Sequence, residues 1–266
     1  NGGGKNKMSN LLGNNEAIEQ LLSKKRTQKN RTHEISNMMK PNNNNNTVEV
    51  DLKTEKPFLK KVKPPQNNIK DNKTKDSLFL KGSEISKTAV LSNLAFKQKL
   101  NNSIGDSSFK IISTLSEAPK ELVPAMYWWA TNKFWYLNNK AAIERINHRE
   151  LLEVIMHRII SLEPEYEQGG AYRFFGVFYS RIPGVELNQS KVYFEKAITS
   201  AENYFGNKVQ KSEFYYQKAE DRSSFLTQLQ SVINLDASIY PEIMAENMFY
   251  QKRAKLLLKQ QDTLFE

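Results

Sequence analysis

Cysteine is absent from the 266-residue sequence, and histidine occurs only three times. The first absence excludes disulfide bonds, thiolate zinc sites and a cysteine nucleophile. The second leaves few metal ligands, and His148 and His157, nine residues apart, would lie on opposite faces of one helix. No catalytic-triad order of Ser, His and Asp and no phosphate-binding loop are present. The sequence therefore predicts neither an enzyme nor a protein that holds a metal or another cofactor.

Long apolar runs are also missing. No window contains the ~18 apolar residues that a membrane-spanning helix needs. The first residues, NGGGKNK, lack the apolar stretch of a signal peptide. A Gly-rich start without Met is typical of a bacterial lipoprotein just after its lipidated cysteine, but any trimmed chain would look the same. A lipid anchor that precedes this chain is therefore a hypothesis.

Tryptophan and tyrosine are missing from residues 1–110, although the chain has three Trp and eleven Tyr. This segment contains 21 Lys+Arg and 10 Asp+Glu, whereas residues 111–266 contain 18 and 19. It also contains an uninterrupted Asn run at 42–46. Such a segment buries too little apolar surface to offset its chain entropy. We predict that residues 1–110 form a basic, Asn/Lys-rich, mostly disordered tether with short helices at 15–22 and 89–100, and that residues 111–266 form the folded domain.

The basic tether resembles nucleic-acid-binding arms only in its charge. Such arms combine Arg clusters with aromatic residues that stack on bases. Here Arg26 and Arg31 are the only arginines of the segment, and its lysines are diluted by Asn, Ser and Thr. This composition favours a solvated tether over nucleic-acid binding. Attraction of the lysines to an anionic membrane surface, worth ~1 kcal/mol per cation, stays open.

Residues 111–266 show a helical period. Asn147 and Glu150 form a capping-box pattern, and Leu152, Ile155 and Ile159 follow on one helix face. Proline, glycine and capping residues predict the remaining boundaries. The first helix is expected to end before Pro164, the next to run from Gly169-Gly170 to Pro183-Gly184, and the others to cover 187–203, 208–219 (capped by Asn207), 222–235 (capped by Asp221) and a segment from Pro241.

The ends of these helices repeat. Tyr166, Tyr204 and Tyr240 occupy equivalent positions that are 38 and 36 residues apart. Residues 172–197 fit the tetratricopeptide pattern W-x-x-L-G-x-x-Y…F…A, with two residues inserted between the helices. The sequence therefore predicts an all-α fold, a tetratricopeptide-like α-solenoid of helix pairs preceded by a long low-complexity segment.

The helical segment contains more aromatic residues than its core needs. A solenoid has a concave groove in which spare aromatic side chains bind peptides or apolar ligands. The neighbours Trp128 and Trp129 point about 100° apart, so one can fill the core while the other meets a partner. Core filling is the competing interpretation for all of these rings. The residues predicted to bind a partner or ligand are Trp128, Trp129, Tyr172, Arg173, Phe175, Tyr179, Tyr215, Tyr216, Asn247 and Arg253.

A series of short strings occurs between residues 117 and 266 in a fairly specific order. They are PAMYWWA (124–130), LEPEY (162–166), GGAYRFFG (169–176), YxxIPG (179–184), SKVYFEKAI (190–198), EDRSSF (220–225), PE (241–242), AEN (245–247), QKRAKLLL (251–258) and LF (264–265). Together they resemble the T-component of tripartite ATP-independent periplasmic (TRAP) transporters. The final two strings matter most, because generic tetratricopeptide repeats do not end in this way.

The resemblance implies a non-catalytic helical accessory protein of the periplasm, tethered to the membrane by a lipid anchor that this chain does not contain. It implies binding to the solute-binding component of a TRAP system, and a homo-oligomer around a hydrophobic channel that could take an apolar ligand. A second hypothesis retains the predicted α-solenoid fold but assigns the protein no role in transport. The chain would then be a structural adaptor in a larger cell-envelope assembly for secretion or motility, with its N-terminal segment ordered against neighbouring subunits.

Overall fold

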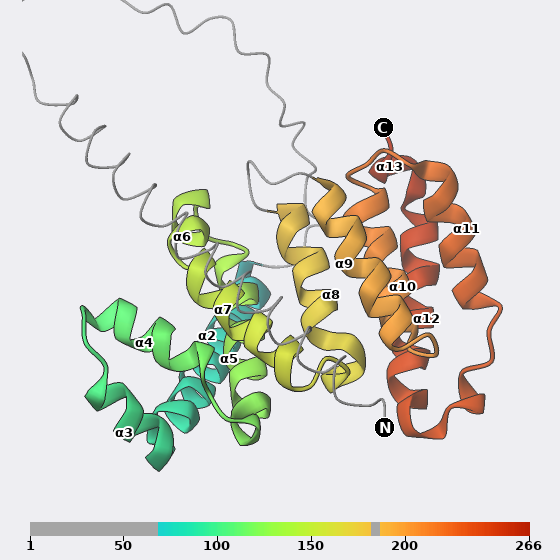
Figure 1. Ribbon diagram of the computed structural model, residues 1–266. Coiled ribbons are helices and arrows are strands. Elements are labelled where there is room, and N and C mark those ends of the chain that lie inside the picture. Colours follow the sequence, from blue (N-terminus) through green and yellow to red (C-terminus); the bar gives the residue numbers. More distant parts are fainter. Residues whose placement is uncertain (1–68, 182–186) are drawn as a thin grey trace, which may run out of the picture. The chain divides into compact units, whose positions relative to one another are not determined.

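The computed structural model describes residues 69–181 and 187–266, which form helices and contain no strand (Figure 1). The predicted all-α class is confirmed. These residues belong to one compact unit of the chain, Val62–Glu266. Its elements are α2 (Ile69–Ser92), α3 (Leu94–Asn102), α4 (Ser107–Ser116), η1 (Lys120–Leu122), α5 (Val123–Leu137), α6 (Ala142–Asn147), α7 (Arg149–Leu162), α8 (Tyr166–Arg181), α9 (Leu187–Ser200), α10 (Phe205–Gln210), the π-helix η2 (Lys211–Tyr216), α11 (Arg222–Ile233), η3 (Ala237–Ile239), η4 (Pro241–Ile243), α12 (Met244–Lys259) and α13 (Gln261–Leu264).

Local sequence explains several helix starts. The Asn93 side chain accepts a hydrogen bond of 3.0 Å from the Phe96 amide and begins α3. The predicted cap at Asp221 is confirmed, since its carboxylate accepts a bond of 2.9 Å from the Ser224 amide and begins α11. Each side chain satisfies one of the amides that a helix start leaves without a partner. Pro124 lies in the first turn of α5, where its missing N–H costs little.

The apolar side chains of the described residues pack in two clusters. The first takes side chains from α2 to α9 and includes Phe175, which is fully buried. The second lies among α10, α11 and α12, with Phe205 and Phe225 fully buried. The neighbours Tyr215 and Tyr216 of η2 pack against the first and the second cluster, respectively. The π-helix therefore carries side chains that contribute to both clusters.

Helices α8 and α9 approach each other closely at Gly176. A Cβ atom at this position would lie 2.7 Å from the ring of Phe194 on α9, a distance that real Cβ atoms do not show. At the same point the Ser190 hydroxyl donates a hydrogen bond of 2.6 Å to the Gly176 carbonyl. The stretch that best matched the repeat pattern is therefore a closely packed helix pair.

Helix α8 starts with a left-handed turn. Glu167, Gln168 and Gly169 have φ values of 52°, 57° and 73°, so the right-handed helix starts only after them. This agrees with the prediction that Gly169-Gly170 opens the helix. The left-handed region costs a non-glycine residue roughly 1–3 kcal/mol, so Glu167 and Gln168 need compensating contacts. Arg173 provides these contacts, as described below.

Four predictions about helix caps and extents are wrong. Asn147 ends α6 and does not cap α7, whose start has no side-chain cap. Asn207 lies inside α10, where its buried side chain bonds to other helices. The predicted helix at 208–219 is divided between α10 and η2, and the predicted helix at 89–100 is divided at Asn93. Tertiary contacts decide these boundaries, and capping patterns reflect only the nearest few residues.

Described helices also occur within residues 1–110, the predicted tether. Helices α2 and α3 lie inside it, and residue 110 itself falls within α4. Val90 of α2 and Phe96 of α3 are fully buried. Helix α2 is polar at most positions and packs along α5, so its stabilisation comes from a neighbour far along the chain. The predicted helix at 15–22 and the predicted helix end at Pro183-Gly184 lie outside the described residues.

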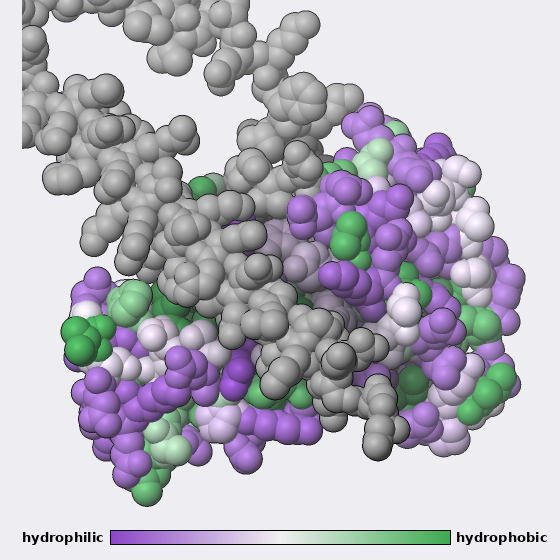
Figure 2. Space-filling model, viewed as in Figure 1, coloured by the Kyte–Doolittle hydropathy of each residue, from purple (hydrophilic) through white to green (hydrophobic). Residues whose placement is uncertain are grey.

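The surface of the described residues is mixed in character. Figure 2 shows apolar residues on one face as separate small patches among hydrophilic ones. Helix α12 contributes four exposed apolar side chains, Met244, Met248, Phe249 and Leu256. Helix α5 contributes Trp128, whose side chain is 44% exposed. None of the described helices has the length and apolar character of a membrane span.

Candidate functional site

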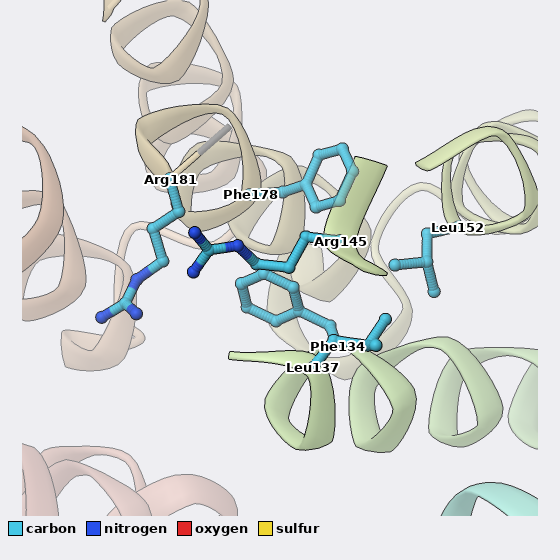
Figure 3. Close-up of a pocket in the computed structure, with 6 residues that line it drawn as sticks. All are labelled: Phe134, Leu137, Arg145, Leu152, Phe178 and Arg181. Carbon is cyan, nitrogen blue, oxygen red and sulfur yellow. The ribbon is translucent and has the colours of Figure 1, made fainter. Parts of the chain in front are cut away.

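A small cavity lies where α5, α6, α7 and α8 meet (Figure 3). Its volume is about 10 Å³, which is close to the space that one water molecule needs. Four apolar and two cationic side chains line it: Phe134 and Leu137 of α5, Arg145 of α6, Leu152 of α7, and Phe178 and Arg181 of α8. Two arginines therefore face an otherwise apolar space.

Both arginines bond to the residue that ends α5. The Arg181 Nη1 atom donates to the Asn138 side-chain oxygen, and Arg145 Nη1 makes a long contact of 3.5 Å with the Asn138 carbonyl. Figure 3 shows the Arg145 side chain reaching between the rings of Phe134 and Phe178 towards Arg181. The Arg145 Nε atom is buried and has no acceptor among the described residues. Some N–H groups of Arg145 and Arg181 thus have no hydrogen-bond acceptor among the described residues.

A third cation, Lys218, lies beside this pair. Its ammonium group donates to the Ser180 carbonyl at the end of α8. Burial lowers the pKa of Lys218, and the positive charges of Arg181 and Arg145 lower it further. Burial also lowers the pKa of Arg181, which Glu213 partly offsets. Three cations therefore lie close enough to repel one another.

Among the described residues, the carboxylate near these cations is already engaged. Glu213 of η2 forms a bidentate ion pair with Arg253 of α12, with 3.2 Å between Arg253 Nε and Glu213 Oε2. The Arg181 guanidinium also lies 5.0 Å above the ring of Phe214. A ring face attracts a cation but does not neutralise its charge. Arg253, a predicted partner residue, is thus placed in an ion pair within the chain.

Another arginine, Arg173, lies in a network of neutral groups. Its guanidinium donates to the Glu167 and Gln168 carbonyls at 3.0 and 3.2 Å, and to the Asn207 side-chain oxygen at 2.9 Å. It also lies 4.9 Å from the centre of the Tyr204 ring. The carbonyl contacts bind the two strained residues that begin α8. Arg173, another predicted partner residue, therefore has a structural position with a side chain that is 8% exposed.

The two neighbouring tryptophans of α5 point to different environments, as predicted. Trp129 is 3% exposed and belongs to the first cluster, whereas Trp128 is 44% exposed. The Trp128 ring packs edge-on against Tyr127 with 5.3 Å between ring centres, and Tyr127 packs in the same way against Tyr166. The edge-on contacts that join Trp128 to Tyr127 of α5 and Tyr127 to Tyr166 of α8 thus hold the exposed Trp128 ring in place.

The remaining predicted aromatic residues are mostly core residues. Phe175 is fully buried and stacks on Tyr179 with 5.3 Å between ring centres. The Tyr179 hydroxyl donates a bond of 3.2 Å to the buried Glu153 carboxylate, and burial raises the pKa of Tyr179. Tyr172 is half-buried, as are Tyr215 and Tyr216. For Phe175 and Tyr179 the structure places the side chain in the core, away from any groove.

Asn247 of α12 is fully buried and has a structural position. Its side-chain oxygen accepts a bond of 2.9 Å from the Phe205 amide, and its amide group donates one of 3.0 Å to the Asn203 carbonyl. It thus caps the start of α10 from another helix. Of the predicted site residues, Trp128 is the one placed with an exposed side chain.

Sequence reasoning missed the cationic cluster of Arg145, Arg181 and Lys218. These residues are separated by more than 30 positions and carry no shared motif; Arg145 lies on α6, Arg181 on α8 and Lys218 in the turn after η2. Tertiary contacts bring them together, since Arg145 and Arg181 bond to Asn138 after α5 and Lys218 bonds to Ser180 at the end of α8. Among the described residues no group of three or more His, Asp or Glu side chains is arranged to hold a metal ion.

The family model of the TRAP transporter T-component matches residues 54–265. The chain belongs to this family. No curated protein matches the chain. The match includes the cationic cavity, the Trp128 surface and helices α2 and α3, which the sequence-based boundary at residue 110 had excluded from the folded domain.

The family assignment fixes the general class of this T-component. It is an accessory component of a TRAP transporter, in a family that is generally non-catalytic. The predicted resemblance is therefore confirmed. Association with the other transporter components follows from the family, whereas the residues that contact them remain a matter of proposal.

Proposed function

We propose that this T-component docks the periplasmic solute-binding component of its TRAP system through the Trp128 surface of α5. The observation that carries this proposal is the exposure of Trp128 beside its buried neighbour Trp129. A tryptophan that is exposed in the free protein and already held by Tyr127 loses little conformational freedom on binding. Aromatic anchors of this kind dominate the energy of many protein interfaces.

The same proposal includes location and assembly. The chain acts in the periplasm, tethered to the membrane by a lipid anchor that precedes it, and associates with copies of itself. Basic residues of the N-terminal segment would add attraction to anionic lipid headgroups. The T-component acts as a scaffold in this proposal and has no catalytic residue.

A binding experiment tests the docking surface. The full chain is immobilised, and the dissociation constant for the solute-binding protein of the same organism's TRAP system is measured by biolayer interferometry. We expect Trp128→Ala to weaken binding at least about 10-fold, the effect of losing one aromatic anchor. Phe249→Ala on α12 is the matched control, because this ring is 62% exposed and lies on a different element.

The control decides how the result is interpreted. Loss of binding in Trp128→Ala with normal binding in Phe249→Ala supports docking at α5. Unchanged binding in Trp128→Ala would overturn it. Cross-linking of native cell envelopes followed by mass spectrometry tests the rival function, since cross-links from residues 1–53 into several subunits of one large assembly would indicate a structural adaptor. These 53 residues lie outside the matched region.

A further inference from the structure

We propose that the cavity between α5, α6 and α8 binds one small monovalent anion, the size of a chloride ion or a carboxylate group, held by Arg145 and Arg181. This site differs from the Trp128 docking surface and is independent of it. It is a ligand site inside the helical unit, with the two guanidinium groups as its donors and the rings of Phe134 and Phe178 as its apolar walls.

Arg145 and Arg181 have more N–H donors than acceptors within reach among the described residues. Each guanidinium has five N–H groups, and the hydrogen bonds of this pair within the described residues reach only the two oxygen atoms of Asn138. The Arg145 Nε atom is fully buried without an acceptor. Buried donors without acceptors are rare in native proteins, and an unrecorded ion or water is one of their ordinary explanations. The Arg145 side chain is one of those that line the cavity.

The charge of the cluster also favours an anion. Arg145, Arg181 and Lys218 lie close enough that each of the arginines lowers the pKa of the lysine. The nearby carboxylate, Glu213, is held by Arg253. Among the described residues, the cluster therefore has more positive than negative charge in a partly buried setting, where unpaired charge is costly. A water molecule in the cavity would accept hydrogen bonds but would leave this excess charge unchanged, whereas an anion would compensate it.

The volume of the cavity limits the size of the anion. A cavity of about 10 Å³ has room for one group little larger than a water molecule, such as a chloride ion or one oxygen of a carboxylate, and none for a large polyatomic anion. Its remaining walls are apolar side chains, which offer no hydrogen bonds to further polar atoms of a ligand. These limits exclude bulky sugar acids. A free halide and the end of a simple carboxylate share the required chemistry, and the experiment distinguishes them.

The test is a titration of thermal stability at constant ionic strength. The full chain is kept in sodium gluconate, whose anion is too large for the cavity, and gluconate is replaced stepwise by chloride or by acetate. We expect the melting temperature to rise with either small anion and to saturate, since a ligand that binds only the folded state stabilises it by mass action. A response to chloride alone identifies an inorganic ion, and a stronger response to acetate identifies a carboxylate ligand.

Variants decide whether the response belongs to this cavity. Arg181→Gln is expected to abolish the saturating rise. Arg222→Gln is the matched control, because Arg222 is an exposed arginine of α11 that pairs with Asp262 away from the cavity. The proposal is overturned if Arg181→Gln and Arg222→Gln respond alike, or if the wild type shows no saturable difference between small anions and gluconate.

A second measurement covers the case in which Arg181→Gln does not fold. The linewidth of the ³⁵Cl NMR signal broadens when chloride exchanges with a protein site, and it can be followed in Arg145→Gln and in the wild type. Broadening by the wild type that is lost in Arg145→Gln supports the site, and equal broadening overturns it. Because Trp128 lies outside the cavity, binding of the partner protein by these variants separates failure of this proposal from failure of the docking proposal.

Discussion

At the scale of single residues, Arg173 shows how a buried charge can be stabilised without a carboxylate. Its partners are two main-chain carbonyls, the side-chain oxygen of Asn207 and the ring of Tyr204. Hydrogen bonds that involve a charged donor are stronger than neutral ones, which offsets part of the cost of removing the guanidinium from water. The carbonyls belong to Glu167 and Gln168, so the same bonds also stabilise the left-handed turn.

Replacing Arg173 is therefore expected to destabilise the protein strongly. Arg173→Met leaves buried carbonyls without a donor and should lower the free energy of unfolding by about 2–4 kcal/mol. Urea denaturation followed by circular dichroism measures this change. Arg222→Met is the control and should alter stability by less than about 0.5 kcal/mol, because its ion pair with Asp262 is exposed. Equal stability of the two variants would contradict the structural role assigned to Arg173.

His157 is the second residue with a measurable consequence. It lies 4.6 Å from the ring centre of Phe175, and burial lowers its pKa to about 4, with the charge of Lys196 as a smaller cause. Because the unfolded chain binds a proton near the ordinary value of 6.5, the unfolded state holds more protons between pH 6.5 and 4. The contribution of this residue is complete above pH 6.5 and is lost as the pH falls towards 4.

The variant His157→Met should remove this pH dependence. Relative to the variant, the wild type is expected to lose roughly 3 kcal/mol of unfolding free energy between pH 7 and pH 4. Denaturation curves at pH 7, 5.5 and 4 give the difference directly. His148→Gln, at the start of α7, is the control and should follow the wild type. A constant difference between His157→Met and wild type across this range would show that His157 is not held neutral by burial.

At the scale of elements, the α8–α9 pair depends on the absence of a side chain at Gly176. The Phe194 ring occupies the space that a Cβ atom would need, and Ser190 bonds to the Gly176 carbonyl. A methyl group at this position has to displace a fully buried ring. Protein interiors are close-packed, so such a displacement spreads to the neighbouring side chains.

Gly176→Ala should therefore destabilise the protein in spite of alanine's better helix propensity. Overpacking of a core typically costs about 1–3 kcal/mol, more than the roughly 1 kcal/mol that alanine contributes to a helix relative to glycine. The melting temperature of the purified variant tests this. Gly82→Ala in α2 is the matched control, because its Cβ atom would meet only the end of the flexible Asn132 side chain, at 3.0 Å. A melting temperature of Gly176→Ala at or above that of Gly82→Ala would contradict the close approach.

At the scale of the whole molecule, the decisive contact lies between helices far apart in sequence. Helix α2 packs along α5, and Asp76 accepts a hydrogen bond of 2.9 Å from the Asn139 side chain and pairs with Lys140 at 3.3 Å. Val90 and Phe96 complete the first cluster. Residues well before position 110 therefore belong to the folded unit.

Truncated chains distinguish the two possible starting points of the folded unit, residue 62 and residue 111. A chain that starts at residue 62 should keep the melting temperature of the full-length helical unit. A chain that starts at residue 111 lacks the buried side chains of Val90 and Phe96 and is expected to melt at least about 5 °C lower, or to aggregate through the uncovered face of α5. Circular dichroism and size-exclusion chromatography record both effects. Equal melting temperatures for the two truncated chains would support a boundary at 110.

The sequence by itself determined the helical class, the repeat and the family. The reason is that a helical period, the repeat pattern at 172–197 and the cap at Asp221 are local patterns, which depend on residues within one helix or one helix pair. The family followed from the order of short strings along the chain. The different environments of Trp128 and Trp129 were also predictable, since adjacent helix positions point in different directions.

The tertiary structure decided the rest. Asn207, Asn247 and Arg253 use their side chains for bonds between helices, which no local pattern reveals. Helix α2 is too polar to be recognised without α5. The pair of Arg145 and Arg181 exists only because α6 and α8 meet at the end of α5. Burial and charge repulsion are properties of distances in space, and the chain brings these groups together only when it folds.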